Sequence, residues 1–247
     1  MKRWQLFGLA LGAYMLWLAA TAPASLLDYG LEQASGGRLR LAESQGTLWS
    51  GTGQIELRDR MHRSGVARSV AWQVLPAYLL RGQLRCEVGL DLAPKRFPVT
   101  ISPAGVEVAD ADVNLPAAAL GLAEPKLAPL GLTGDVWVHI ARVAFRANAV
   151  QGAATLQWRG AGSAYTPISP LGDYELRFEG EGATVRATLR TLQGPLQLDG
   201  QGSWASGRNP TFLGTARIPP EHQQQLAPLM RMIALDRGEG RFTLQLN

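Results

Sequence analysis

The chain has 247 residues, of which 46% are apolar, and 24 Lys and Arg residues against 20 Asp and Glu residues give a formal net charge of +4. This composition supports a sizeable hydrophobic core and excludes wholesale disorder. The single cysteine, Cys86, excludes an intramolecular disulfide framework and a cysteine-cluster metal site. The mildly basic charge argues against a nucleic-acid partner.

The first segment of the chain is an apolar run. Two basic residues precede an uncharged stretch from Trp4 to Leu27. Such a stretch is just long enough to cross a hydrocarbon layer of about 30 Å as a helix. Because the positive charge precedes the run, the N-terminus is expected to face the cytoplasm. We therefore expect cytoplasmic residues at 1–3, a transmembrane anchor at 4–24 and a periplasmic remainder, the arrangement of a single-pass protein of the cell inner membrane.

A cleaved signal peptide is the competing interpretation of this run. The residues Ala22-Pro23-Ala24 resemble an A-x-A cleavage site. Pro23 lies next to the bond that would be cut, and Tyr14 and Trp17 are bulky for such a segment. These residues favour an uncleaved anchor.

From residue 45 onward the main signal is alternation of apolar and polar residues, which is typical of strands. One face of each predicted strand is apolar and the other is charged, as in antiparallel sheets with a single buried face. We therefore expect a mainly β fold, a curved antiparallel sheet. The predicted strands are 46–58, 68–75, 84–91, 97–102, 134–145, 152–159, 174–179, 184–191, 195–204, 211–218 and 241–246.

Helical periodicity outside the first segment is confined to two places. One is Leu115–Leu122, and the other is Pro220–Leu235, where the pair Pro219-Pro220 sets the start. The sequence thus predicts two short helices in addition to the anchor.

Two sets of residues suggest an internal duplication. Trp49–Gly53 matches Trp158–Gly162, and the tetrapeptide Leu-Ala-Pro-Leu occurs at 127–130 and again at 226–229. The expected division is a first β half at 25–122, a Pro-rich linker at 123–130 and a second β half at 131–247. Coincidence of common residues is the alternative.

The sequence contains no motif for a serine hydrolase, a zinc protease or a nucleotide-binding loop. The three histidines, His62, His139 and His222, are far apart in sequence. We expect no enzymatic activity, no cofactor and no metal site.

The most basic stretch lies between Arg38 and Arg85. An arginine-rich patch can contact lipid headgroups or an acidic partner, and a plain solvated face needs no partner. The residues assigned to this predicted interaction patch are Arg58, Arg60, Arg63 and Arg68.

Several blocks resemble a known family. The run Gln45–Gly51 reads Gln-Gly-Thr-Leu-Trp-Ser-Gly, and it is followed by Trp72–Pro76, Ser169–Tyr174 and Gly194–Gly200. In this order the blocks resemble the N protein of the bacterial type II (general) secretion system, over nearly the whole chain. The residues that carry the resemblance are Gly46, Trp49, Gly51, Gly53, Trp72, Pro76, Trp158, Gly172, Gly194 and Pro195.

The resemblance implies an inner-membrane protein with one spanning helix and a periplasmic β domain. Such proteins belong to the machinery that exports folded proteins across the outer membrane. They are thought to contact the secretin and other inner-membrane components, and they have no known enzymatic activity. The family has no established catalytic or ligand residues to assign here.

Two functions are consistent with these observations. The first is a structural subunit that docks a partner through a sheet edge or the arginine patch. The second is a module that binds or transfers a lipid or another apolar ligand along a groove on the apolar face of the sheet. Whether that face is filled by its own side chains or hollow separates the two.

Overall fold

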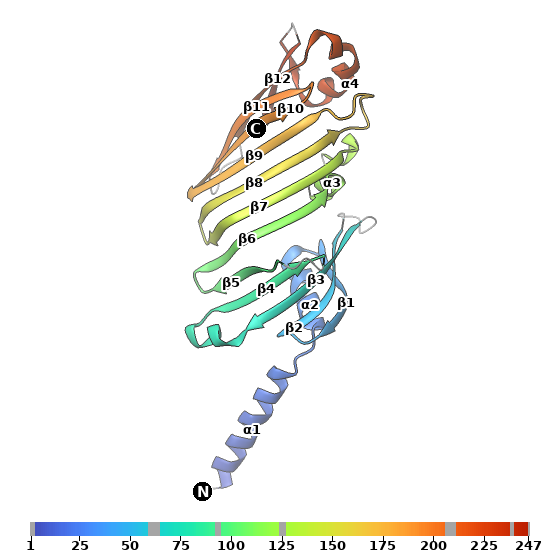
Figure 1. The fold of residues 1–247 in the computed structure, drawn as a ribbon. Coiled ribbons are helices and arrows are strands. Elements are labelled where there is room, and N and C mark those ends of the chain that lie inside the picture. The colour runs from blue at the N-terminus through green and yellow to red at the C-terminus, as the bar shows by residue number, and fades with distance from the viewer. Residues whose placement is uncertain are drawn as a thin grey trace. The chain divides into compact units, whose positions relative to one another are not determined.

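The computed structural model describes residues 3–58, 65–91, 95–123, 127–205, 211–237 and 240–246. Antiparallel strands make up most of the described chain, and the helices are few and mostly short (Figure 1). The predicted mainly β, antiparallel fold is therefore confirmed. The chain divides into two compact units, Met1–Arg96 and Phe97–Asn247.

The N-terminal helix α1 is shorter than the predicted anchor. It spans Arg3–Ala20, 18 residues whose first three are Arg, Trp and Gln. At a rise of about 1.5 Å per residue it reaches about 27 Å, and polar residues in its first turn are unfavourable in hydrocarbon. Among the described residues, no helix is both long enough and apolar enough to span a membrane.

This finding corrects the expected location. The expected single-pass inner-membrane arrangement, with its spanning helix at 4–24, is therefore wrong. The continuous apolar run in the sequence does not form one helix, because α1 ends at Ala20 and a second helix starts at Ser25.

The first unit is a small antiparallel sheet covered on one face by a helix. Ala24, Leu41, Val70 and Trp72 form its buried core. Leu27 and Leu31 pack against this core one helical turn apart, so they present a single apolar stripe to the sheet. The elements are α2 (Ser25–Ser35), β1 (Leu39–Gly46), β2 (Ser50–Arg58), β3 (Gly65–Leu75), the 3₁₀ helix η1 (Pro76–Arg81) and β4 (Leu84–Leu90), with strand order β1-β2-β3-β4.

The second unit is a longer antiparallel meander, in strand order β5 to β12, then β14 and β13. Each strand pairs with its neighbour in sequence until the end, where β14 pairs with β12 and β13 lies outside it. The elements are β5 (Phe97–Ser102), β6 (Gly105–Pro116), α3 (Ala118–Ala123), η2 (Ala128–Leu130), β7 (Thr133–Arg146), β8 (Ala149–Gly162), β9 (Gly172–Gly182), β10 (Thr184–Gln193), β11 (Gln197–Ala205), β12 (Thr211–Arg217), η3 (Pro220–His222), α4 (Gln223–Ile233), β13 (Leu235–Asp236) and β14 (Arg241–Leu246).

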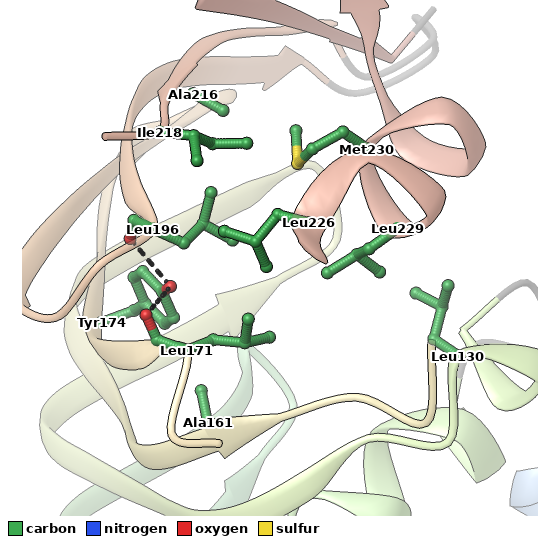
Figure 2. Close-up of a cluster of buried hydrophobic side chains, with 10 residues drawn as sticks. All are labelled: Leu130, Ala161, Leu171, Tyr174, Leu196, Ala216, Ile218, Leu226, Leu229 and Met230. Carbon is green, nitrogen blue, oxygen red and sulfur yellow. Dashed lines mark hydrogen bonds between the residues drawn. The ribbon is translucent and has the colours of Figure 1, made fainter. Parts of the chain in front are cut away.

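Helix α4 closes one end of the second unit. Its residues Leu226 and Met230, one turn apart, are fully buried (0% exposed) against the sheet. Figure 2 shows them facing Leu171, Leu196 and Ile218. Burial of each leucine side chain contributes about 2 kcal/mol. Both α3 and α4 follow strands that run in the same direction, β6 and β12, so they lie at the same end of the strands (Figure 1).

Away from these helices, the apolar face of the second unit is only half-buried. Val138, Leu156 and Leu176 stand opposite one another in register on β7, β8 and β9, and each is partly exposed. Phe178, one step along β9 on the same face, is also partly exposed. We refer to Val138, Leu156, Leu176 and Phe178 as the apolar strip.

The expected division into halves at 25–122 and 131–247 rests on sequence similarity. The compact units instead meet between Arg96 and Phe97. The duplication itself stays a prediction.

Candidate functional site

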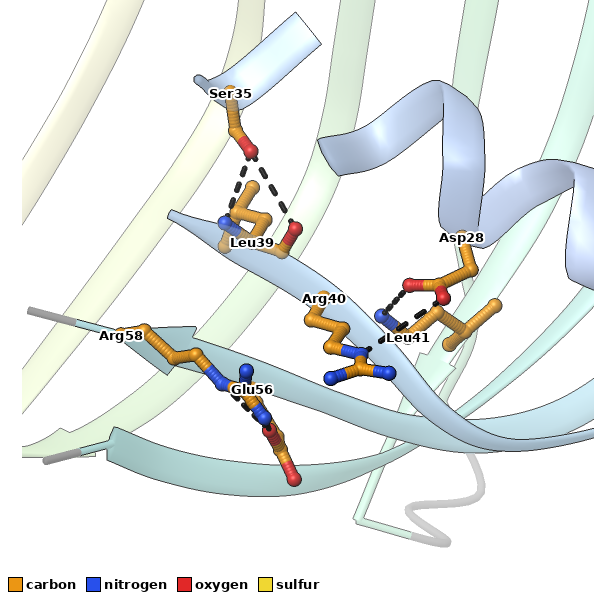
Figure 3. Close-up of polar contacts among 7 residues, drawn as sticks. All are labelled: Asp28, Ser35, Leu39, Arg40, Leu41, Glu56 and Arg58. Atoms are coloured by element: carbon orange, nitrogen blue, oxygen red, sulfur yellow. Dashed lines mark hydrogen bonds and ion pairs between the residues drawn. The ribbon is translucent and has the colours of Figure 1, made fainter. Parts of the chain in front are cut away.

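Helix α2 covers the outer edge of β1 with side chains (Figure 3). The backbone N–H of Leu39 donates to Ser35 Oγ at 2.9 Å, and that hydroxyl lies 3.4 Å from the Leu39 carbonyl oxygen. One step along the strand, the N–H of Leu41 donates to Asp28 Oδ1 at 2.7 Å. The other side of β1 pairs with β2. These outward backbone groups are therefore already hydrogen-bonded within the chain.

Exposed strand edges attract other strands, and proteins commonly cover them. Asp28 and Ser35 lie two turns apart on α2, and they bond Leu41 and Leu39, two residues apart on β1. Asp28 also lies within 3.9 Å of the Arg40 guanidinium, a contact too long and too exposed to add much. The edge of β1 is thus closed to strand addition at Leu39 and Leu41.

The last strand of the second unit, β14, is covered over part of its outer side. On the outer side of β14, β13 pairs only at Leu235 with Thr243 and at Asp236 with Phe242. Strand β14 continues to Leu246, and its inner side pairs with β12 along its length. Within the described ranges, no other strand pairs on this outer side. Leu235 is 58% exposed at this edge.

The predicted arginine patch is only partly described. Arg60 and Arg63 lie outside the described residues. Arg58 Nε donates to Glu56 at 2.9 Å, and Arg68 Nη1 donates to Asp91 at 2.8 Å. In register, Arg58 stands opposite Gly65 and Arg68 opposite Ile55, so the two arginines project from opposite faces of the sheet. The structure does not bring these two together, and the patch as a whole stays a prediction.

In the first unit, the residues that carry the family resemblance surround Trp72. Its indole Nε1 donates to the carbonyl oxygen of Thr47 at 3.1 Å. Gly51 stands opposite Trp72 in register, and a Cβ there would come within 2.5 Å of the indole. Glycine at this position gives the ring its space. Gly46 ends β1, Trp49 precedes β2, Gly53 lies within β2 and Pro76 opens η1.

In the second unit, the two later blocks of the resemblance pack against each other. The Tyr174 hydroxyl lies 2.9 Å from the carbonyl oxygen of Leu196 and 3.2 Å from that of Leu171 (Figure 2). The Leu196 N–H donates to the Leu171 carbonyl oxygen at 3.1 Å. Gly194 has a φ of +126°, and a Cβ there would collide with the Cα of Gly172. Burial raises the pKa of Tyr174, so the hydroxyl stays protonated as a donor.

Two further residues of the resemblance belong to the same region. Trp158 stands opposite Tyr174 with ring centroids 5.9 Å apart, and Pro195 directly precedes Leu196. Their surroundings are those of structural residues. None of them lines a cluster of reactive groups among the residues that the structure describes.

The polar face of the second unit centres on a carboxylate that the sequence did not single out. Glu175 on β9 is 5% exposed. Arg190 and Arg177 donate to its Oε1 at 2.7 and 3.1 Å, and Gln157 donates to its Oε2 at 3.1 Å. Burial alone would raise the pKa of Glu175, but these hydrogen bonds and positive charges outweigh it and lower that pKa. The carboxylate is therefore held ionised as a structural group.

The three histidines are not brought together. His139 on β7 contacts Asp112 on β6 at 2.5 Å, His222 ends η3, and His62 lies outside the described residues. In the part of the chain described here, no group of three or more His, Cys, Asp or Glu side chains could hold a metal ion. Burial raises the pKa of the Cys86 thiol, which makes it a poor nucleophile.

With this geometry established, comparison with known proteins identifies the family. A family model described as type II secretion system (T2SS), protein N, matches residues 37–245. The chain belongs to this family. The resemblance found in the sequence blocks is thus confirmed, and the chain is a component of the type II secretion system. No curated protein and no solved structure matched it.

The range matched by the protein N family can be compared with the bounds of the two compact units. The match begins just after α2 and runs through both compact units into β14. The family is a structural component of a protein-export machine and is not known as an enzyme.

Proposed function

We propose that the chain acts in type II secretion by contact with other proteins of the machine, the secretin or the inner-membrane subunits, and not by catalysis. The observation that carries this proposal is the outer side of β14. Strand β13 pairs there only with Phe242 and Thr243, and from Leu244 to Leu246 no other strand among the described residues pairs on that side. This part of the edge is therefore available for a partner strand.

Strand addition suits a structural subunit. Backbone N–H and C=O groups along an edge supply hydrogen bonds that do not depend on sequence, and alternate side chains supply specificity. At the β14 edge, the exposed Leu235 offers an apolar contact beside those backbone groups. The proposed contact is an extended segment of a secretion subunit, paired with β14 beyond β13.

Co-purification of the full chain with the secretin and the inner-membrane subunits of the same system tests the proposal. Leu235→Lys places a charge at the edge, which discourages strand pairing. The matched control is Leu213→Lys, because Leu213 is similarly exposed (61%) but lies on β12, an interior strand. Capture of a partner should fall at least fivefold for Leu235→Lys only. Equal capture by both variants, or no capture by the unmodified chain, would contradict the proposal.

A second function, binding of a lipid or another apolar ligand, is favoured by one observation. The apolar strip of Val138, Leu156, Leu176 and Phe178 is half-buried, although it lies on the apolar face of the sheet. A strip of this kind gains free energy when an acyl chain covers it, at about 25 cal/mol for each Å² of apolar surface buried.

Uptake of a fluorescent fatty acid by delipidated full-length protein tests this second function. Leu176→Gln should reduce uptake because it places a polar group in the strip, and Leu213→Gln on the other face should not. Absence of uptake by the unmodified protein would rule the function out.

A further inference from the structure

The polar face of the second unit contains a hollow of about 390 Å³ that crosses strands β6 to β9. It is lined by an indole, an amide, carboxylates and guanidinium groups. A volume in this range is ordinary for a small-molecule site. The lining residues used below are Asp112, Trp137, Gln157, Arg159, Glu175 and Arg177.

An exposed indole lies in this hollow. Trp137 on β7 is 46% exposed, although its neighbours in register on this face are polar: Asn114 on β6 and Gln157 on β8. The Arg159 guanidinium lies 5.8 Å from the centroid of the Trp137 ring. The indole therefore offers apolar ring surface beside polar side chains.

The polar groups around the indole are held in place by a buried anchor. Glu175 is almost fully buried, and it accepts a hydrogen bond from the Gln157 amide nitrogen at 3.1 Å. The Gln157 amide oxygen in turn accepts from Arg159 Nη2 at 2.9 Å. This chain of hydrogen bonds fixes the planes of the amide and the guanidinium beside Trp137. Groups fixed in advance lose little entropy when a ligand binds.

The charged groups of the lining are engaged within the protein. Asp112 contacts His139 at 2.5 Å, and the Glu175 carboxylate is paired with Arg177 and with Arg190. A ligand that needs no opposite charge therefore suits the hollow, which offers hydrogen-bonding groups beside a flat apolar surface.

A neutral sugar ring has the complementary chemistry. One face of the ring carries C–H groups, which are apolar and slightly positive and so complement the negative face of an indole. Its hydroxyl groups lie around the rim and both donate and accept hydrogen bonds. Planar amide and guanidinium groups can contact neighbouring hydroxyls in pairs.

We propose that this hollow is a saccharide-binding site, in which a sugar ring stacks on Trp137 while its hydroxyls bond to Gln157 and Arg159. Glu175 is a positioning residue that orients Gln157. This site lies on the face opposite the apolar strip and does not depend on the β14 edge, so it stands apart from the functions proposed above.

Titration calorimetry of the full-length protein with neutral oligosaccharides tests the site. The probes are N-acetylglucosamine oligomers, cellohexaose and maltohexaose, each measured separately up to millimolar concentration. At least one should bind, and Trp137→Ala should weaken that binding at least tenfold. Trp137→Phe should retain part of it, because a smaller aromatic face remains.

Trp204→Ala is the matched control, since Trp204 is 37% exposed but lies on the other face of the sheet against Phe178. Thermal unfolding of each variant checks that the fold is intact. The proposal is overturned if no probe binds, or if a folded Trp137→Ala variant binds as tightly as the unmodified protein. It is also overturned if Trp137→Ala abolishes capture of a secretion subunit while no oligosaccharide binds, because the surface is then a protein contact.

Discussion

Trp72 and Trp158 have equivalent surroundings in the two compact units. Each indole Nε1 donates to the carbonyl oxygen of a threonine 25 residues earlier, Thr47 at 3.1 Å and Thr133 at 2.9 Å. Trp72 also stands opposite Val88 across the sheet, and Trp158 opposite Tyr174, at the same sequence separation. The segment β2–β3–β4 therefore has a counterpart in β7–β8–β9. Sequence matching pairs Trp158 with Trp49 instead, so the proposed duplication has two possible alignments.

Replacement of either indole tests these hydrogen bonds. Trp72→Phe removes the donor and leaves the part-buried Thr47 carbonyl unpaired, which should cost about 1–2 kcal/mol of unfolding free energy. Trp158→Phe should cost less, because its bond to Thr133 is exposed and water can replace the donor. Urea denaturation measures this loss. Trp204→Phe controls for lost aromatic area, because the Trp204 ring contacts Phe178 at a half-exposed position. A loss no greater than that of the control would contradict the role of the hydrogen bond.

Gly194→Ala should be among the most destabilising single changes in the second unit. Its Cβ would collide with the Cα of Gly172 and lie 2.7 Å from the Leu171 carbonyl oxygen, so the backbone must move. We expect a loss of about 3 kcal/mol or more. Gly182→Ala is the control, since Gly182 also has a positive φ (+81°) but a Cβ there meets no atom within 4 Å. Its loss should be about 1 kcal/mol. Equal thermal shifts for the two variants would show that the close approach is unimportant.

The lowered pKa of Glu175 makes stability depend on pH in a defined direction. The folded protein holds this carboxylate ionised more strongly than the unfolded chain does. Its contribution is therefore complete above the ordinary glutamate pKa of about 4.3 and is lost as pH falls through the lower folded value. Glu175→Gln should destabilise by about 1 kcal/mol at pH 7, a modest value because the partner arginines are half-exposed.

Urea midpoints of both proteins between pH 7 and pH 3 measure this difference, which should shrink as the solution becomes more acidic. Glu181→Gln is the control, because Glu181 pairs with Arg186 at a well-exposed position and should have little effect. A difference between Glu175→Gln and the unmodified protein that stays constant over this range would contradict the assignment.

Opening the guarded edge of β1 should promote self-association. Asp28→Ala removes the acceptor for the Leu41 N–H, whereas Asp28→Asn keeps an oxygen in the same place. Light scattering over a concentration series should show larger species for the alanine variant than for the asparagine variant or the unmodified chain. If all three behave alike, Asp28 does not protect the edge.

Most strands could be predicted from the sequence, because one face of each strand is apolar and the other is polar. The predicted 84–91, 97–102 and 134–145 correspond closely to β4, β5 and β7. The helices expected at Leu115–Leu122 and Pro220–Leu235 correspond to α3 and to η3 with α4. In these places local pattern and tertiary structure agree.

Strand β6 was missed for a physical reason. Its apolar positions are Val106 and Val108 in the first part and Ala111 and Val113 in the second, so the alternation changes phase. The change occurs at Asp110, whose φ of +50° is irregular for a strand. An irregular residue of this kind shifts the alternation by one position, so Ala111 and Val113 lie on the same face of the sheet as Val106 and Val108. A search for strict alternation of apolar and polar residues therefore finds two short fragments in place of one strand.

Most residues of the candidate sites could not be predicted from the sequence. Residues from 25 onward were assigned to the first β half, so helix α2 and the bonds of Asp28 and Ser35 to β1 were not predicted. Trp137 and Glu175 come from β7 and β9, and only the register of the sheet brings them to one hollow. The resemblance, by contrast, depended on local blocks and was visible directly.

The side chains that occupy the edge of β1 also limit how copies of this chain can assemble. A fibre that grows by strand pairing needs two receptive edges on every molecule, one for each neighbour. Because Asp28 and Ser35 bond β1 at Leu41 and Leu39, a second copy cannot pair with β1 at these two residues. Growth of a fibre through this edge is therefore disfavoured.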